Sequence, residues 1–438
     1  MKKDLPAFGL SCKAQRTVPQ AINYLLQVAI DHEDMISLAA GMVDEQTLPA
    51  PMLRRLSDKL LDDEHVGRKA LQYGSTEGLL GLREALLEHV CGLEGMTAEQ
   101  LSLSAANVVV SSGSQQILYI LTDVLVDPGD VVITEWPSYF VYTGGLRSLG
   151  AEVHAIDMDA DGMRVDRLAE VLADYRRSGQ LHRVKMIYTC DYCQNPTGIT
   201  LSGPRRRELL EVVRAYSTDR RICLVEDAAY RELMVEGDPP PSIKSGDTDN
   251  TLVALVQSFS KSFSPGMRAG YAVLPDDLVA PVLDQKGNHD FGSSNLIQNL
   301  LAELMASGEY PRHVAMLRRL YRAKRDAMLA ALKEHLGDFE PEATAWTRPR
   351  GGLYVWLTLP ERIDTGKSGE LFAAALSAGV LYVPGEFCFG PDPRRQAPRN
   401  CMRLTFGTVP ADAIDEGVRR LAGAIRQVAG RRQGVKAL

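Results

Sequence analysis

The segment "SFSKSFSPGMRAGY", Ser258 to Tyr271, places a single lysine directly after an apolar run. That run, "TLVALVQSF" at 251–259, is rich in β-branched residues, which is typical of a buried strand. A lysine after a strand is ordinarily exposed to solvent. Lys261, however, stands between Phe259 and Phe263. Desolvation by these rings would lower its pKa and make its amine a nucleophile.

Groups that suit a phosphate surround this lysine. Ser258 and Ser260 offer hydroxyl donors, and Arg268 offers a planar cation that can bind a dianion through two hydrogen bonds. An amine nucleophile beside an anion site suggests a Schiff base with pyridoxal 5'-phosphate (PLP). This hypothesis requires further groups for the phosphate and for the pyridine ring.

The phosphate and the ring face could be held at the ends of two earlier strands. Gly113, Ser114 and Gln115 in "SSGSQQ" lie at a strand-to-helix turn, where backbone N–H groups can bind a phosphate. Tyr139 in "EWPSYF" follows another strand, and its ring could stack on the cofactor.

The polar edge of the ring needs donors for its 3-oxygen and a carboxylate for its nitrogen. Asn195 in "NPTG" and Tyr230 can donate to the 3-oxygen. Asp227 in "VEDAAY" follows a strand and could keep the pyridine nitrogen protonated, so that the ring acts as an electron sink.

The remaining pattern predicts an α/β protein. Apolar, β-branched runs alternate with helical segments, as in a mostly parallel sheet between helices. We predict strands at 107–113, 130–137, 184–190, 221–227, 251–259 and 268–274, a long helix at about 293–335, and further strands at 351–359, 380–384 and 401–407. The predicted units are an N-terminal arm at 1–50, a large domain at 51–305 and a smaller α+β domain at 306–438.

Composition excludes several classes of protein. The chain has 438 residues, 45% of them hydrophobic, and a net charge of −7, which does not suit a nucleic-acid binder. No apolar run is long enough to cross a membrane, and the start lacks the apolar segment of a signal peptide. The seven cysteines are an odd, scattered set, which indicates reduced thiols and a cytoplasmic protein. The eight histidines show no metal-binding spacing, so we predict no metal.

Cys190 and Cys193 form a C-x-x-C immediately before the "NPTG" turn. A zinc site needs a second ligand pair, and a redox dithiol needs a frame in which the first cysteine begins a helix. Neither condition is met, so we interpret both as reduced thiols. Whether they, with Asp191 and Tyr192, alter the pocket stays open.

Together, the motifs of this chain resemble those of the class I/II aminotransferases of PLP fold type I. "NPTG", D-x-x-Y, S-x-S-K-x-x-x-P-G-x-R-x-G, a late "RLTF" and "QYGSTEGLLGLREAL" (Gln72 to Leu86) all match the family's pattern. The resemblance runs from about Ile36 to residue 425 and is strongest to the aminoadipate/kynurenine-type enzymes. It implies a large domain with a mostly parallel seven-stranded sheet and a smaller C-terminal domain.

The resemblance also implies roles for individual residues. Lys261 would form the internal aldimine and then move the proton at Cα. Arg403 would bind the substrate α-carboxylate, with Gly41 and Asn195 nearby. Tyr73 resembles the tyrosine that reaches the phosphate of the neighbouring subunit, which implies a homodimer with shared active sites.

The reaction expected is transfer of an amino group from an L-amino acid to a 2-oxo acid. Aromatic, kynurenine-like, branched-chain and aminoadipate donors all remain open, although "PQAINYLLQ" (Pro19 to Gln27) lacks the arginine that aminoadipate enzymes carry there. Alternatives are another PLP reaction (a β-lyase, decarboxylase or amino-acid oxidase) or the PLP-sensing effector domain of a transcription regulator. About 35 residues before "ISLAAG" are too few for a regulator's DNA-binding domain.

Overall fold

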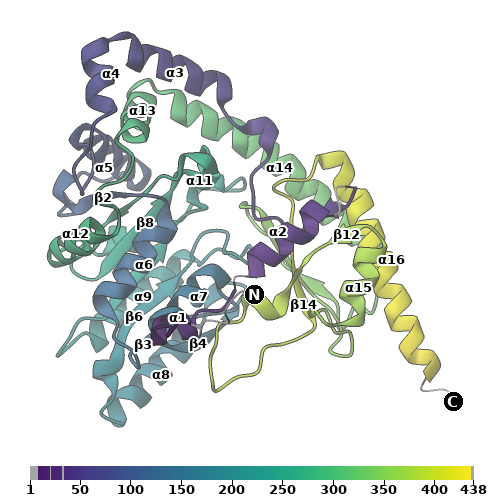
Figure 1. Ribbon diagram of the computed structural model, residues 1–438. Helices are drawn as coiled ribbons and strands as arrows, with labels where there is room; N and C mark the ends of the chain where they lie inside the picture. The colour runs from purple at the N-terminus through teal and green to yellow at the C-terminus, as the bar shows by residue number, and fades with distance from the viewer. Residues whose placement is uncertain (1–7, 20, 32–33, 436–438) are drawn as a thin grey trace, which may run out of the picture.

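An eight-stranded sheet forms the centre of the larger part of the molecule in this computed structural model, which describes residues 8–19, 21–31 and 34–435 (Figure 1). The strand order is β2-β9-β8-β7-β6-β3-β4-β5. The strands are β2 (Val108–Ser111), β3 (Val131–Trp136), β4 (Glu152–Asp159), β5 (Gly162–Met163), β6 (Val184–Thr189), β7 (Cys223–Asp227), β8 (Val253–Ser258) and β9 (Gly270–Val273).

The sheet is mostly parallel, as predicted. β4, β3, β6, β7 and β8 pair in parallel, while β9 runs antiparallel between β8 and β2. The carboxyl ends of β2, β3, β6, β7 and β8 therefore meet at one edge, where α/β sheets bind ligands. The resemblance predicted seven strands; the eighth is the two-residue β5, which begins at Gly162 and pairs antiparallel with β4.

The strand β4 was not predicted from the sequence. Its residues, "EVHAIDMD", alternate between buried and partly exposed positions because the strand lies near the edge of the sheet. A buried central strand reads as a continuous apolar run, whereas this one does not. The alternation of polar and apolar residues was a usable signal for a half-buried strand.

Helices cover both faces of the sheet. One face packs against α8 (Val165–Arg177), α9 (Gly203–Tyr216) and α10 (Ile243–Gly246). The other packs against α5 (Leu80–Glu94), α6 (Ser114–Leu125), α7 (Phe140–Leu149), α12 (Asp276–Asp290) and α13 (Asn295–Ala306). In β3, for example, the neighbouring residues Val131 and Val132 enter the two separate cores.

A second, antiparallel sheet lies in the C-terminal part of the chain. Its order is β10-β11-β14-β13, and it has its own apolar core with the flanking helices. The elements are α14 (Glu309–Leu336), β10 (Ala345–Trp346), β11 (Tyr354–Thr358), α15 (Glu370–Ser377), β13 (Val383–Pro384), β14 (Cys401–Thr405) and α16 (Ala411–Val435). The predicted strand at 380–384 is divided, because β12 (Val380–Leu381) pairs with the N-terminal β1 (Ile36–Ser37).

The helix predicted at 293–335 is two helices. Gly308, with a φ of +67°, separates α13 from α14. Residues of α14 enter both cores: Tyr310 to Tyr321 pack under the large sheet, and Met328 to Leu336 pack in the C-terminal core. Because α14 contributes to both cores, the predicted domain boundary between residues 305 and 306 stays a prediction.

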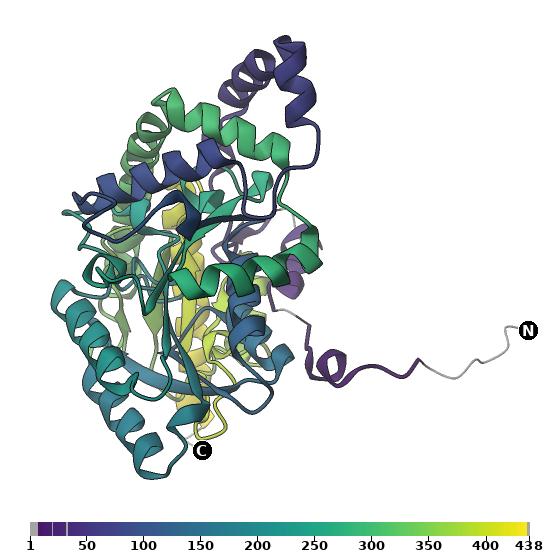
Figure 2. The same ribbon diagram turned by 90° about the vertical axis from the view of Figure 1, so that its left-hand side faces the viewer.

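The N-terminal segment contacts both parts. α1 (Cys12–Arg16) lies against α7, where Arg16 Nε donates to the Ser148 carbonyl at 3.2 Å, and residues 8–11 lead away from the body in Figure 2. α2 (Ala21–Asp31) adjoins the C-terminal part, and α3 (Ala50–Asp62) and α4 (Glu64–Ala70) lie over α13 (Figure 1). Among the described residues, no helix combines the length and apolarity needed to cross a membrane.

Candidate active site

A cavity of about 170 Å³ opens at the carboxyl edge of the large sheet. It brings together segments from five strand ends. Of the residues predicted from the sequence, ten line it: Ser114, Gln115, Tyr139, Asn195, Asp227, Tyr230, Ser258, Ser260, Lys261 and Arg268.

Lys261 lies in the short helix α11 (Phe259–Ser262), directly after β8. Its Nζ donates to the carbonyl oxygen of Gly41 at 2.6 Å. Burial lowers the pKa of this amine; the neighbouring Tyr354 opposes the shift, and Arg403 and Arg268 add to it. A lowered pKa is what the sequence predicted for a nucleophilic lysine.

Arg268 and the start of α6 form a cradle for an anion. Gly113 caps α6 with a φ of +85° and no side-chain cap; the Gln116 N–H bonds to the Gly113 carbonyl, so the N–H groups of Ser114 and Gln115 are the ones that could bind a ligand. A Cβ at this glycine would lie 2.8 Å from Arg268 Nη2, so only glycine leaves the space free. Ser260 adds its hydroxyl, 3.4 Å from Arg268 Nη1.

Gln115 and Ser258 complete this cradle. Gln115 Oε1 is buried and has no hydrogen-bond partner; because this oxygen only accepts, Gln115 would donate to a phosphate through its backbone N–H or its amide N–H₂. The hydroxyl of Ser258 caps α11 by accepting from the backbone N–H of Ser260 at 3.1 Å. The donor set of hydroxyls, a guanidinium and helix-start amides fits a phosphate.

Asp227 is buried at the end of β7. Its carboxylate accepts from the Tyr188 hydroxyl at 2.9 Å and from the backbone N–H of Ala229 at 3.2 Å. Burial raises its pKa to about 6, and these two donors oppose the shift. A buried carboxylate with no cation beside it suits a ligand that carries a protonated nitrogen.

Arg403, on β14, is a buried cation with 1% of its side chain exposed. Its Nη1 donates to Asn195 Oδ1 at 2.9 Å and its Nη2 to the Ala39 carbonyl at 2.8 Å, while its Nε has no partner. Within the described part of the chain, no carboxylate lies within ion-pair distance of it. An unpaired buried guanidinium is costly, so the site is built to receive an anion.

Comparison with known proteins identifies the family. Residues 33–421 match the model of the "Aminotransferase class I and II" family. The chain belongs to the class I and II aminotransferases. It is a PLP-dependent aminotransferase, and the cavity fits PLP, because the anion cradle, Lys261 and Asp227 surround a single space.

Several enzymes are similar to this aminotransferase. An aromatic-amino-acid aminotransferase of Thermococcus litoralis is 34% identical, over 91% of this chain and 89% of that protein. A 2-aminoadipate transaminase of Thermus thermophilus is 32% identical, over 96% of each. The solved Pyrococcus horikoshii kynurenine aminotransferase is 32% identical, with a TM-score of 0.86 over 95% of this chain and 97% of that one.

Transcription regulators are also related to this aminotransferase. The uncharacterised HTH-type regulator YdfD of Bacillus subtilis is 29% identical, over 95% of this chain and 78% of that protein. The predicted resemblance to the class I/II family is confirmed, and so is the predicted PLP.

Tyr73 is the predicted site residue that lies elsewhere. It is 82% exposed and does not line the cavity of its own chain. Its ring meets that of Phe291 edge to face, with centroids 5.5 Å apart.

The structure separates the residues at 190–193, whose effect on the pocket the sequence left open. Cys190 lines the cavity, but Asp191 is buried away from it and forms an ion pair with Arg206. Tyr192 lies over the same guanidinium, at 3.9 Å from the ring centroid. Cys193 is a buried free thiol. Asp191 therefore supports the turn from outside the pocket.

Sequence reasoning missed Tyr354 and Glu135. Tyr354 is buried beside Lys261 and Arg403, and no local motif links it to them. Glu135, in "EWPSYF", accepts from the Gln194 side chain at 2.8 Å and from Thr189 Oγ1 at 2.6 Å. Burial raises its pKa to about 7. A carboxylate inside an otherwise apolar strand was the available signal.

One described surface group, Glu334, His335 and Asp415, has the spacing of possible cation ligands. It lies where α14 meets α16, outside the cavity, so the absence of a metal stays a prediction.

Proposed function

We propose that this enzyme transfers the amino group of an L-amino acid to a 2-oxo acid with Lys261 as the proton carrier and Arg403 as the carboxylate clamp. The observation that supports this assignment is the buried, unpaired guanidinium of Arg403 close to the amine of Lys261. Amino acids and 2-oxo acids share one group, the α-carboxylate, and one cation can serve both substrates.

Arg403 would hold the substrate by its α-carboxylate. Its Nε–H and the remaining Nη protons are available, while Asn195 and the Ala39 carbonyl fix the plane of the guanidinium. Because the planar guanidinium is held from two sides, it would bind a carboxylate in one orientation. Gly41 leaves room there, since a Cβ at this position would lie 3.7 Å from Arg403 Nη2.

The groups around the ring have separate tasks. PLP, when bound, delocalises the electron pair that is left when Cα loses its proton. Asp227 would hold the proton on the ring nitrogen, because the Tyr188 hydroxyl and the Ala229 N–H leave lone pairs free on each of its oxygens. Asn195 keeps its amide N–H₂ for the ring 3-oxygen, since its carbonyl oxygen is used by Arg403. Tyr230 would donate to the same oxygen.

Lys261 would take the proton from Cα and return it at C4′. Burial lowers its pKa and so favours the neutral amine, which is the form that a general base requires. Tyr139 begins the turn into α7, lines the cavity and would cover one face of the ring. Gly113, Ser114, Gln115, Ser258, Ser260 and Arg268 would anchor the phosphate, so that ring and amine keep their relative position.

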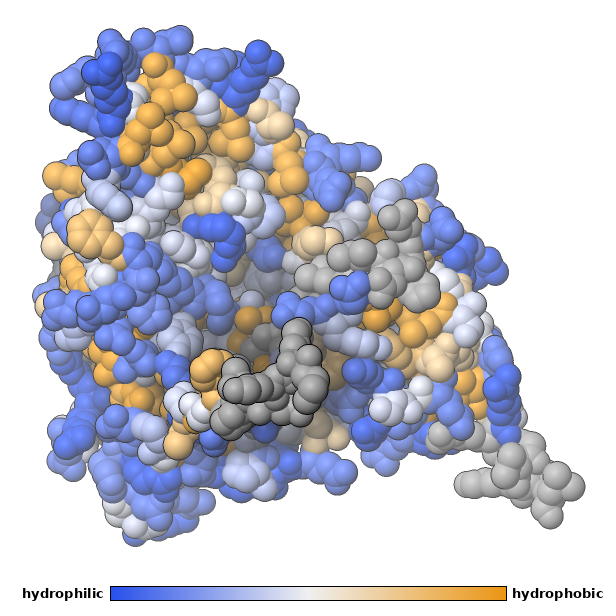
Figure 3. Space-filling model, in the orientation of Figure 1, coloured by the Kyte–Doolittle hydropathy of each residue, from blue (hydrophilic) through white to orange (hydrophobic). Residues whose placement is uncertain are grey.

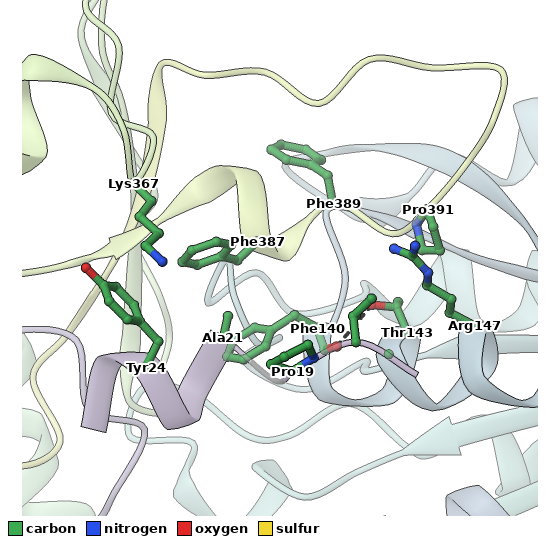
Figure 4. A pocket seen from close by; sticks show the side chains of 12 residues that line it. Pro19, Ala21, Tyr24, Phe140, Thr143, Arg147, Lys367, Phe387, Phe389 and Pro391 are labelled. Atoms are coloured by element: carbon green, nitrogen blue, oxygen red, sulfur yellow. Dashed lines mark hydrogen bonds between the residues drawn. The ribbon is translucent and has the colours of Figure 1, made fainter. Parts of the chain in front are cut away.

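A groove beside Arg403 is suited to the donor side chain (Figure 4). Its volume is about 430 Å³, and its walls include Tyr24, Phe140, Phe387 and Phe389. Phe140 lines the groove and also contacts the clamp, with its ring centroid 5.6 Å from Arg403 Cζ. The aromatic walls favour aromatic, kynurenine-like or branched-chain donors.

Two cations at the groove also keep aminoadipate-type donors open. Lys367 and Arg147 line it, and Lys367 Nζ lies 3.7 Å from the Tyr24 ring centroid. Neither side chain has an ion-pair partner within the described ranges. Figure 4 shows them at opposite ends of the groove. They would serve a distal carboxylate in place of the arginine missing from Pro19 to Gln27.

A homodimer with shared sites is the assembly we propose. Tyr73 and Phe291 form an exposed aromatic pair, 82% and 61% exposed, that would reach the phosphate site of a second copy. Apolar side chains also gather over α3, α4 and α13 in Figure 3, and Leu71, just beyond α4, is 66% exposed. Such patches usually mark interfaces. The cytoplasm is the compartment we propose for this dimer.

One experiment tests the reaction. Purified enzyme with PLP is mixed with each of phenylalanine, kynurenine, leucine and 2-aminoadipate, without an acceptor and then with 2-oxoglutarate or pyruvate. Transamination predicts one equivalent of 2-oxo product per site without acceptor and continuous turnover with it. Release of ammonia, carbon dioxide or peroxide without acceptor would instead support a lyase, decarboxylase or oxidase. No conversion of any donor would favour the regulator's effector function.

A further inference from the structure

Tyr354 connects groups that the proposed mechanism uses separately. It begins β11, and its side chain is only 1% exposed. Its hydroxyl oxygen lies 3.1 Å from the hydroxyl oxygen of Tyr230. Its ring lies under the Arg403 guanidinium, with 4.3 Å between Cζ and the ring centroid. The same hydroxyl also lies 3.1 Å from the place that a Cβ would occupy at Gly41.

The direction of the hydroxyl–hydroxyl contact follows from counting protons. A phenol has one O–H donor and can accept through its lone pairs. In the proposed function, Tyr230 gives its proton to the ring 3-oxygen. Its oxygen can then only accept from Tyr354. Burial raises the pKa of Tyr230 well above the usual value, which keeps it a neutral donor.

We infer that Tyr354 is a positioning residue that strengthens the donation of Tyr230 to the ring oxygen and supports the plane of Arg403. The inference rests on the proposed roles of Tyr230 and Arg403. A donor that itself accepts a hydrogen bond is polarised and donates more strongly, above all in a dry site. The ring of Tyr354 acts independently of its hydroxyl, because a cation over an aromatic face is attracted by the π-system.

The two contributions can be separated by two substitutions. Tyr354→Phe keeps the ring and removes only the hydroxyl. A weaker bond to the 3-oxygen disfavours its ionised form, so the pKa at which the bound cofactor changes its visible absorbance should rise by about half to one unit. The KM for the amino donor should change by less than about two-fold. Tyr354→Leu also removes the ring, so its KM should rise by about ten-fold.

Tyr382→Phe is the matched control. Tyr382 is equally buried, and its hydroxyl donates to the Thr365 carbonyl at 2.9 Å in the C-terminal core, away from the cavity. This variant should leave the spectroscopic pKa unchanged. Thermal unfolding of all variants separates a loss of stability from a change at the site.

The test for coupling uses Tyr230→Phe. In that background Tyr354→Phe should cause no further shift of the spectroscopic pKa, because the donor that it assists is gone. An equal shift in both backgrounds, or no shift in either, would overturn the inference. If the wild-type protein with added PLP shows no titrating cofactor band, the proposed function fails first, and this inference fails with it.

Discussion

Replacement of Arg403 by lysine should disable substrate binding while leaving the cofactor in place. The guanidinium is buried, holds Asn195 and the Ala39 carbonyl, and keeps its Nε–H free. Lysine retains the charge but has one nitrogen, so it cannot make all of these hydrogen bonds and also bind a carboxylate in two places.

The magnitude follows from the hydrogen bonds that a lysine cannot replace. One charge-assisted hydrogen bond to the substrate is worth about 1.5–3 kcal/mol, and an unsatisfied Asn195 Oδ1 costs about 1–3 kcal/mol. Their sum, roughly 2.5–6 kcal/mol, corresponds to a fall of about 10²- to 10⁴-fold in kcat/KM. Most of this should appear in KM, since the carboxylate is held in the ground state and the transition state alike.

The assay is a single-turnover reaction of the PLP-loaded enzyme with an amino donor, followed by the visible absorbance of the cofactor. The control is Arg399→Lys, an arginine 45% exposed that pairs with Asp364 and Glu386 on the surface. It should stay within about two-fold of wild type, because exposed ion pairs contribute little. A fall of less than about five-fold for Arg403→Lys, or an equal loss of PLP affinity, would refute the clamp assignment.

Further expected outcomes concern the lysine, the buried carboxylate and the glycine. Lys261→Ala should lose the visible band and the borohydride-reducible linkage to the cofactor; a linkage that survives would place it on another residue. Asp227→Asn should keep PLP but lower kcat by about 10²-fold or more, and unchanged turnover would exclude its role at the ring nitrogen. Because the pKa of Asp227 is raised to about 6 from 3.8, the folded apoprotein holds this proton more tightly than the unfolded chain does. The free energy of unfolding of the apoprotein should therefore fall as pH rises from about 4 to 6, by up to about 3 kcal/mol. Denaturant unfolding of the wild-type and Asp227→Asn apoproteins at pH 4 and 7 checks this, and identical pH dependence would contradict it. Gly41→Ala puts a Cβ 3.1 Å from the Tyr354 hydroxyl and 3.7 Å from Arg403, so the donor KM should rise by about ten-fold at unchanged PLP absorbance.

Much of the fold can be predicted from local sequence patterns. Central strands such as β6 and β8 are continuous apolar runs, and the residues that follow them are the ones that meet at the carboxyl edge. We did not predict β4, because its position near the edge of the sheet gives it an alternating pattern of polar and apolar residues. We predicted α13 and α14 as one helix, because an apolar helical pattern continues across Gly308.

Within the site, the residue types at the strand ends can be predicted from the sequence, because strands and motifs are patterns of residues that are neighbours in the chain. Which of these side chains contact one another depends on the tertiary structure. It buried Arg403 with no counter-ion among the described residues, directed Asp191 to Arg206 instead of the pocket, and placed Tyr354 against Tyr230. The contacts of Arg403 with Asn195 and of Tyr354 with Tyr230 join segments far apart in the chain. Their distances depend on how the antiparallel sheet packs against the large one, which no local pattern encodes.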